Sequence, residues 1–170
     1  MARANIILTG FMGTGKSTVG KLVAKALGYG FVDTDELIQA RCGQTVPEIF
    51  RERGEAAFRD MEAEIARELG AKEGLVVSTG GRLMLDPGNA RALGGTGRVF
   101  CLRATPEEIL ARVTGDSGVA RPLLQTENPL ERVVELMRQR EPGYARFTQL
   151  ETTGIPPEEA ARRLLDIYRS

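Results

Sequence analysis

Histidine and tryptophan are absent from this 170-residue chain, and aromatic residues make up only 5% of it. Without histidine, the chain can form neither a histidine-based catalytic triad nor a zinc site with imidazole ligands. Any acid–base chemistry must therefore come from Asp, Glu, Lys or water.

An excess of charge is missing as well, because 23 Lys and Arg balance 23 Asp and Glu. No overall basic field therefore favours a nucleic-acid partner or an anionic membrane surface. No apolar run approaches the ~20 residues of a membrane span, and residues 1–8 lack the pattern of a signal peptide. Cys42 and Cys101 form no C-x-x-C pair, so we expect two reduced, packed thiols in a cytosolic protein.

What the chain does contain is a glycine-rich stretch between an apolar β-type run and a helical pattern, Gly10-Phe11-Met12-Gly13-Thr14-Gly15-Lys16-Ser17-Thr18. It matches G-x-x-x-x-G-K-[ST], the phosphate-binding loop, whose glycines let successive backbone N–H groups point at a polyphosphate. We expect Lys16 to reach the β- and γ-phosphates and the Ser17 hydroxyl to ligate Mg²⁺. The predicted nucleotide-binding residues are Gly13, Thr14, Gly15, Lys16, Ser17 and Thr18.

β-type runs alternate with helical patterns along the chain, and the length suits one domain spanning residues 1–170. The runs lie at residues 6–9, 31–33, 75–78, 98–103 and, more weakly, 148–152. Thr45 with Glu48 forms a capping box, and we expect Asp86 and Asn128 each to cap a helix that opens on the proline that follows. The repeated βα units predict an α/β three-layer sandwich with a central, mostly parallel five-stranded sheet. In such sheets ligands bind beyond the carboxyl ends of the strands.

Two carboxylates follow the second of these runs, at Asp33 and Asp35. While the chain stays extended, both side chains project to the same side. A kinase needs one carboxylate for the metal shell and another to orient or deprotonate the accepting hydroxyl. We assign Asp33 to the metal and Asp35 to the hydroxyl. A structural alternative is that Asp35 merely caps a helix starting at Glu36.

Together these features resemble the shikimate kinase family, in the nucleoside-monophosphate-kinase branch of phosphate-loop kinases. The resemblance covers nearly the whole chain. Its motifs are the phosphate loop, Asp33-Thr34-Asp35, Gly54-Glu55 with Phe58-Arg59 and Glu62, Ser78-Thr79-Gly80-Gly81, Arg121-Pro122-Leu123-Leu124 and Arg140-Glu141-Pro142-Gly143-Tyr144. The phosphate loop alone specifies only a nucleotide, whereas the aspartate pair, Phe58-Arg59, the double glycine and Arg140…Tyr144 point to this family.

The resemblance implies an acceptor site around residues 34–62. Asp35 would hold the ring hydroxyls, and Arg59 and Arg140 would hold the acceptor's carboxylate, as guanidinium forks can. The backbone at Gly80 and Gly81 would approach the acceptor closely. Read without the resemblance, Arg59 is a surface arginine that Glu62 could pair with, and Arg140 is a solvated charge at a helix end.

The resemblance also implies a mobile lid at about residues 115–125, carrying Arg121. This arginine would close over the phosphates, neutralise charge on the transferring phosphoryl group and help to exclude water. Arg112, on the helix before the lid, is open to two interpretations, a contact with the adenine or phosphates and a solvated helix charge. Residues 153–156 match the family's adenine loop only loosely, so we assign no base-binding residue there.

One position departs from the family, which usually carries a third glycine where this chain has Arg82. A large cation there would either crowd the acceptor pocket or point to solvent.

We therefore expect a monomeric, cytoplasmic enzyme that uses ATP and Mg²⁺ to phosphorylate the 3-hydroxyl of shikimate, on the way to chorismate and the aromatic amino acids. Gluconate is the nearest alternative acceptor, because it also offers a carboxylate and hydroxyls. A nucleoside monophosphate acceptor would need aromatic side chains that stack on its base, and this chain has few aromatic residues and no tryptophan. A guanine-nucleotide switch would need Asn-Lys-x-Asp, but Asn5, Asn89 and Asn128 are followed by Ile, Ala and Pro.

Overall fold

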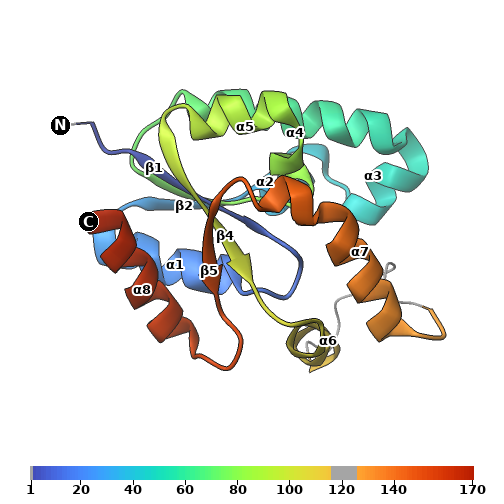
Figure 1. Cartoon of the computed structure of the whole chain (residues 1–170). Coiled ribbons are helices and arrows are strands. Elements are labelled where there is room, and N and C mark those ends of the chain that lie inside the picture. The colour runs from blue at the N-terminus through green and yellow to red at the C-terminus, as the bar shows by residue number, and fades with distance from the viewer. Residues whose placement is uncertain (1, 116–125) are drawn as a thin grey trace.

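Five parallel strands form one sheet at the centre of the computed structural model, which describes residues 2–115 and 126–170 (Figure 1). The strands are β1 (Asn5–Gly10), β2 (Gly30–Asp33), β3 (Leu75–Ser78), β4 (Gly97–Arg103) and β5 (Thr148–Glu151). Their order across the sheet is β2-β3-β1-β4-β5, and every neighbouring pair is parallel. The predicted α/β class is confirmed, with a sheet that is parallel throughout.

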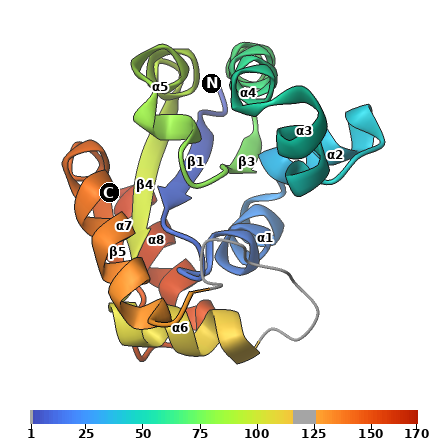
Figure 2. The ribbon, with the colours of Figure 1, turned by 90° about the vertical axis from the view of Figure 1, so that its right-hand side faces the viewer.

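Helices cover both faces of the sheet, as the alternating pattern predicts. They are α1 (Lys16–Leu27), α2 (Thr34–Cys42), α3 (Val46–Arg53), α4 (Glu55–Gly70), α5 (Pro87–Gly94), α6 (Pro106–Gly115), α7 (Pro129–Tyr144) and α8 (Pro157–Arg169), with a short 3₁₀ turn, η1, at Leu83–Leu85. In Figure 1, α4 and α5 lie above the sheet, and α1 and α8 lie below it. Seen end-on in Figure 2, α2 and α3 lie to one side and α7 to the other.

Alternate residues of β1 build the two halves of the core, because successive side chains of a strand point to opposite faces. Ile6 and Leu8 belong to the cluster formed with α1 and α8. Ile7 belongs to the cluster formed with α2, α3, α4 and α5. β1 is thus buried on both sides, and its far end delivers the phosphate loop.

The helix boundaries follow the capping signals, although one of the capping side chains makes no hydrogen bond. Thr45 and Glu48 form the predicted capping box of α3, and the Asp86 carboxylate accepts from two backbone N–H groups at the start of α5. Asn128 is the N-cap of α7, as predicted, and Pro129 at the first helical position opens the helix, but the Asn128 side chain makes no capping bond. The predicted lid lies almost entirely in residues 116–125, outside the described residues, and Arg121 lies there too. No helix among the described residues is long and apolar enough to cross a membrane.

A buried asparagine ties β1 to the connection between α4 and β3. Asn5 is 1% exposed, and its side-chain amide donates to the carbonyl oxygens of Leu69 (3.3 Å) and Lys72 (2.8 Å). Its side-chain oxygen accepts from the Leu75 N–H at 2.9 Å. One side chain therefore satisfies three backbone groups where two neighbouring strands of the sheet begin.

The Asn5→Ala substitution should lower the free energy of unfolding by about 3 kcal/mol, because it leaves one buried and two partly buried backbone groups without these partners. Urea denaturation measures the change. Asn128→Ala is the matched control, since Asn128 is exposed and makes no capping bond, and it should change stability by less than about 0.5 kcal/mol. Equal losses in the two variants would contradict the role of Asn5.

Candidate active site

A cavity of about 510 Å³ lies at the carboxyl ends of β1, β2 and β3, where a parallel sheet is expected to bind ligands. Nearly all of the site residues predicted from the sequence line it. They are Gly13, Gly15, Lys16, Ser17, Thr18, Asp33, Asp35, Arg59, Gly80, Gly81 and Arg140. Thr14 does not; it is buried behind the loop, where its hydroxyl donates to the Phe11 carbonyl at 2.8 Å.

The phosphate loop has the backbone that its glycines allow. Gly13 and Gly15 have φ angles of +75° and +96°, in the left-handed region that other residues rarely adopt. Gly15 is the N-cap of α1, and no acidic residue lies in the first turn of this helix. The loop therefore presents backbone N–H groups and a helix N-terminus, which together bind anions.

Lys16 is the buried cation of this loop. Its ammonium donates to the carbonyl oxygens of Gly10 (2.8 Å) and Phe11 (3.0 Å). Burial lowers the pKa of Lys16 to about 8, and the nearby Asp35 carboxylate opposes part of that shift. A polyphosphate beside Lys16 would favour the charged form further.

Ser17 and Asp33 meet beside the loop. The Ser17 hydroxyl donates to Asp33 Oδ2 at 2.7 Å and lies 3.2 Å from the Ser78 hydroxyl. One carboxylate and two hydroxyls therefore gather hard oxygen donors, the ligand type that Mg²⁺ prefers. No group of three or more His, Cys, Asp or Glu able to hold a metal occurs among the residues that the structure describes.

The backbone around Asp35 differs from the prediction. The chain does not stay extended to this residue, because α2 begins at Thr34. Asp33 rather than Asp35 caps this helix, through the bond from the Glu36 N–H to Asp33 Oδ1 at 3.1 Å. The structural alternative for Asp35 is therefore wrong, and Asp35 lines the cavity from the first turn of α2.

Gly80 makes room for Asp35. A Cβ atom at Gly80 would lie 2.7 Å from Asp35 Oδ1, which is closer than real Cβ contacts. The Gly80 N–H donates to the Thr34 hydroxyl at 2.9 Å, which fixes the turn after β3 against the start of α2. The side-chain group that lies closest to the Gly80 backbone is therefore the Asp35 carboxylate.

Arg59 enters the cavity from α4 with a fixed side chain. Its Nη1 donates to Glu62 Oε1 at 2.6 Å, so the pairing considered from the sequence is confirmed. Glu62 is 1% exposed; burial raises its pKa, and the Arg59 guanidinium opposes that rise. The guanidinium also lies 5.3 Å from the centre of the Phe58 ring. These contacts hold Arg59 at the cavity wall.

Arg140 enters the cavity from α7, near Gly81. A Cβ atom at Gly81 would lie 3.0 Å from Arg140 Nη1. The buried Tyr144 hydroxyl donates to the Gly81 carbonyl oxygen, and burial raises the pKa of Tyr144 to about 12. The Arg140 guanidinium also packs 5.1 Å from the centre of the Phe11 ring. Arg140 is therefore a cavity residue and not a solvated charge at a helix end.

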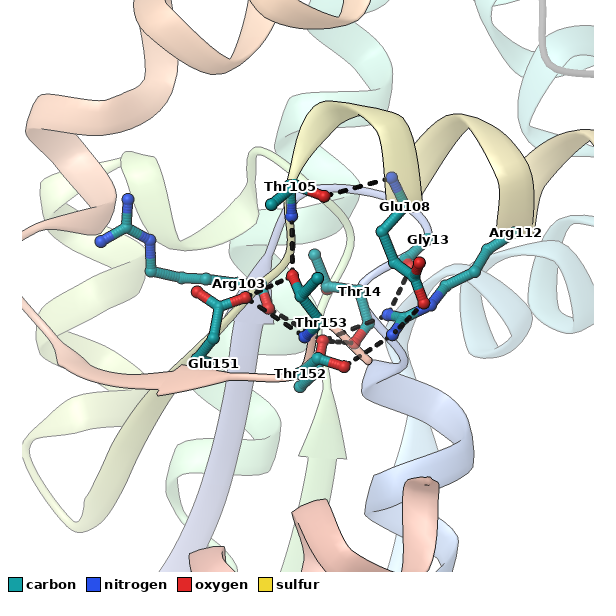
Figure 3. Close-up of polar contacts among 9 residues, drawn as sticks. All are labelled: Gly13, Thr14, Arg103, Thr105, Glu108, Arg112, Glu151, Thr152 and Thr153. Carbon is teal, nitrogen blue, oxygen red and sulfur yellow. Dashed lines mark hydrogen bonds and ion pairs between the residues drawn. The ribbon is translucent and has the colours of Figure 1, made fainter. Parts of the chain in front are cut away.

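A second cavity, of about 430 Å³, lies on the other side of the phosphate loop. Arg112 lines it and donates to the Gly13 carbonyl (3.1 Å) and the Thr152 carbonyl (2.7 Å), as Figure 3 shows. It also pairs with Glu108 at 3.2 Å. Of the two interpretations of Arg112, the solvated helix charge is therefore wrong. Ile155 and Pro157 complete the wall of this cavity.

Sequence reasoning missed the apolar wall of the first cavity, which Met12, Val46 and Phe50 provide. A signal was present, because Val46 and Phe50 lie four residues apart on a helix whose start the capping box marks, and such residues share one helix face.

The fold and this site define the class as a phosphate-loop kinase. The shikimate kinase family model matches residues 12–169. A shikimate kinase of Thermodesulfovibrio yellowstonii is 45% identical over 96% of this chain and 94% of its own. One from Thermus thermophilus is 46% identical over 95% of this chain and 88% of its own.

A solved structure agrees with these relatives. The shikimate kinase of Acinetobacter baumannii in complex with shikimate has a TM-score of 0.90 and 36% identity, covering 98% of this chain and 93% of that one. The chain belongs to the shikimate kinase family.

The lowered pKa of Lys16 predicts how nucleotide binding depends on pH. The charged form binds phosphate, and in the free protein it is lost as the pH rises through about 8. Affinity for ADP without metal should therefore be flat below that pH and fall above it, by up to about tenfold per unit, until the higher pKa of the complex is reached. Calorimetric titrations between pH 7 and 9.5 measure this. Lys16→Met should bind weakly with a flat profile, whereas Lys21→Met, on the exposed face of α1, should keep the wild-type profile.

Proposed function

We propose that this enzyme transfers the γ-phosphoryl group of ATP to the 3-hydroxyl of shikimate, giving shikimate 3-phosphate and ADP in the route to chorismate and the aromatic amino acids. One observation carries the proposal: a single cavity joins a phosphate loop to two arginines through Asp35. The Asp35 charge acts on the pKa of Lys16, on the phosphate side, and on that of Glu62, on the arginine side. A carboxylated alcohol held by the arginines would therefore meet Asp35 and the phosphates together.

The nucleotide would lie along the phosphate loop. The N–H groups from Gly13 to Thr18 and the ammonium of Lys16 would bind its phosphates. The second cavity, beside Arg112 and Ile155, is lined by residues of the same loop and would bind the adenosine part of ATP. The base site, to which the sequence alone assigns no residue, would therefore lie beside Arg112 and Ile155.

The donor set beside the loop fits Mg²⁺, which favours oxygen ligands and retains several waters. Ser17 would bind the metal directly, and Asp33 would hold it, in part through water. Bound Mg²⁺ would neutralise charge on the β- and γ-phosphates. The chain's own contribution is to orient this pair, since Ser17 and Asp33 already contact each other at 2.7 Å.

The acceptor would bind by its carboxylate to Arg59 and Arg140, which can form paired hydrogen bonds with it. The backbone at Gly80 and Gly81 would border the ring. Asp35 would then orient the accepting hydroxyl or take its proton as the phosphoryl group transfers. Kinase catalysis consists mostly of positioning and electrostatic stabilisation, which agrees with a chain that has no histidine.

Arg121 would stabilise the charge on the transferring phosphoryl group from a mobile lid at about residues 115–125. The lid and the acceptor region, at about residues 34–62, would belong to a single kinase domain, residues 1–170.

We also propose that the protein is a cytoplasmic monomer. The described cysteines, Cys42 and Cys101, are both free, and Leu130 is the one large apolar side chain exposed in the described part of the chain.

Coupled ADP release should occur with shikimate and not with gluconate or nucleoside monophosphates. Asp35→Asn should cut kcat by about a hundredfold or more while ADP binding persists, because the role of Asp35 lies on the acceptor side. Asp60→Asn, an exposed position on α4, is the matched control and should keep wild-type turnover. Turnover with another acceptor in preference to shikimate would overturn the proposal.

Asp33→Asn tests the metal assignment separately. An asparagine keeps the capping of α2, so the thermal midpoint should stay close to that of the wild type. The gain in ADP affinity on adding Mg²⁺ should shrink by about tenfold, since a charged ligand is lost. Calorimetry with and without Mg²⁺ measures it. An unchanged gain would remove Asp33 from the metal shell.

A further inference from the structure

Arg82 lies at the mouth of the first cavity and has no role in the phosphoryl transfer proposed above. It follows Gly81 directly, lines the cavity, and its side chain is 55% exposed. Its φ and ψ of −111° and −3° suit any residue. The backbone therefore does not require glycine here, and a long cation is tolerated without strain.

The neighbouring Arg59 already has carboxylate partners on its donor groups. Nη1 donates to Glu62, as described above. Nε and Nη2, the edge that can hold a carboxylate with two hydrogen bonds, both donate to Glu55 Oε1, at 3.4 and 3.2 Å. A ligand carboxylate that uses this edge must compete with Glu55.

Glu55 has a second cation on its other side. Arg82 Nη1 lies 3.7 Å from the same Glu55 Oε1 that Arg59 contacts. Glu55 is 56% exposed and is the first residue of α4, so its side chain can move without disturbing buried contacts. Arg82 and Arg59 thus share one mobile carboxylate across the mouth of the cavity.

We propose that Arg82 is a positioning residue for the acceptor's carboxylate: it retains Glu55 when that carboxylate takes over the paired donors of Arg59. The exchange leaves every charge paired, because the acceptor replaces Glu55 on Arg59 while Arg82 holds Glu55 aside. Arg82 would also offset the repulsion between Glu55 and the incoming carboxylate. This inference rests on the proposed acceptor being a carboxylated alcohol.

The test separates acceptor binding from chemistry. Arg82→Met removes the charge and keeps most of the side-chain length. Glu55 then stays on Arg59, so the KM and the Kd for shikimate should rise by about two- to fivefold, the range for an exposed ion pair, while kcat stays within about twofold. Arg82→Lys should restore most of the affinity. Arg51→Met, another exposed arginine beside a glutamate, should change nothing.

A double-substitution cycle shows whether Arg82 acts through Glu55. In a Glu55→Gln background, Arg82→Met should no longer raise the KM for shikimate. The primary amide of shikimate should be insensitive to Arg82→Met in the wild-type background, because a neutral amide does not displace Glu55 from Arg59. An unchanged KM in Arg82→Met, or an equal rise in the Glu55→Gln background, would overturn the inference.

The same assays distinguish this failure from a failure of the proposed function. If the wild-type enzyme does not turn over shikimate, the proposed function is wrong. If it does, and Arg82→Met keeps the wild-type KM, only the role of Arg82 is wrong.

Discussion

The missing side chains at Gly80 and Gly81 are the constraint on which the acceptor half of the site depends. Asp35 approaches Gly80 so closely that a Cβ atom there would collide with its carboxylate, and Arg140 lies almost as close to Gly81. These two glycines lie in the connection between β3 and the 3₁₀ turn η1, and a Cβ atom at either position would force the Asp35 carboxylate or the Arg140 guanidinium to shift. The carboxylate from α2 and the guanidinium from α7 can therefore enter one cavity from opposite sides of the turn after β3.

The cavity holds its charges in a near balance of opposite groups. Lys16, Arg59, Arg82 and Arg140 face Asp33, Asp35 and Glu62 along its lining. A buried charge is costly unless it is paired. The buried Glu62 is accordingly paired with Arg59, and the buried Lys16 donates to backbone carbonyl oxygens. Anionic ligands entering such a cavity would replace protein partners rather than fill an unbalanced positive field. Selectivity among anionic ligands would then depend on how easily each ligand displaces the protein groups that pair with the cavity's cations.

Sequence predicted most of the fold because its local signals agree with the tertiary structure. Proline and capping residues opened α3 and α5 where expected, and alternating βα units gave the parallel sheet. The phosphate loop and its context likewise predicted where the glycines, Lys16 and Ser17 would gather.

The sequence failed where two local rules competed. Asp33 looked like the end of a strand, and the chain was expected to continue extended to Asp35. Asp33 does end β2, but it also caps α2, so the helix begins at Thr34 and Asp35 lines the cavity from the first turn of α2. The role of Arg112 could not be decided either, because its partners at Gly13 and Thr152 are 99 and 40 residues away. Only the folded chain brings such residues together.

The buried ammonium of Lys16 links nucleotide binding to the solvent's proton supply. Because the pKa of Lys16 is about 8, a fraction of the molecules has a neutral Lys16 at mildly alkaline pH. In these molecules Lys16 takes up a proton from the buffer when phosphate binds. The heat released on binding then includes the ionisation heat of the buffer. Two buffers at the same pH should therefore give different apparent enthalpies for one and the same complex.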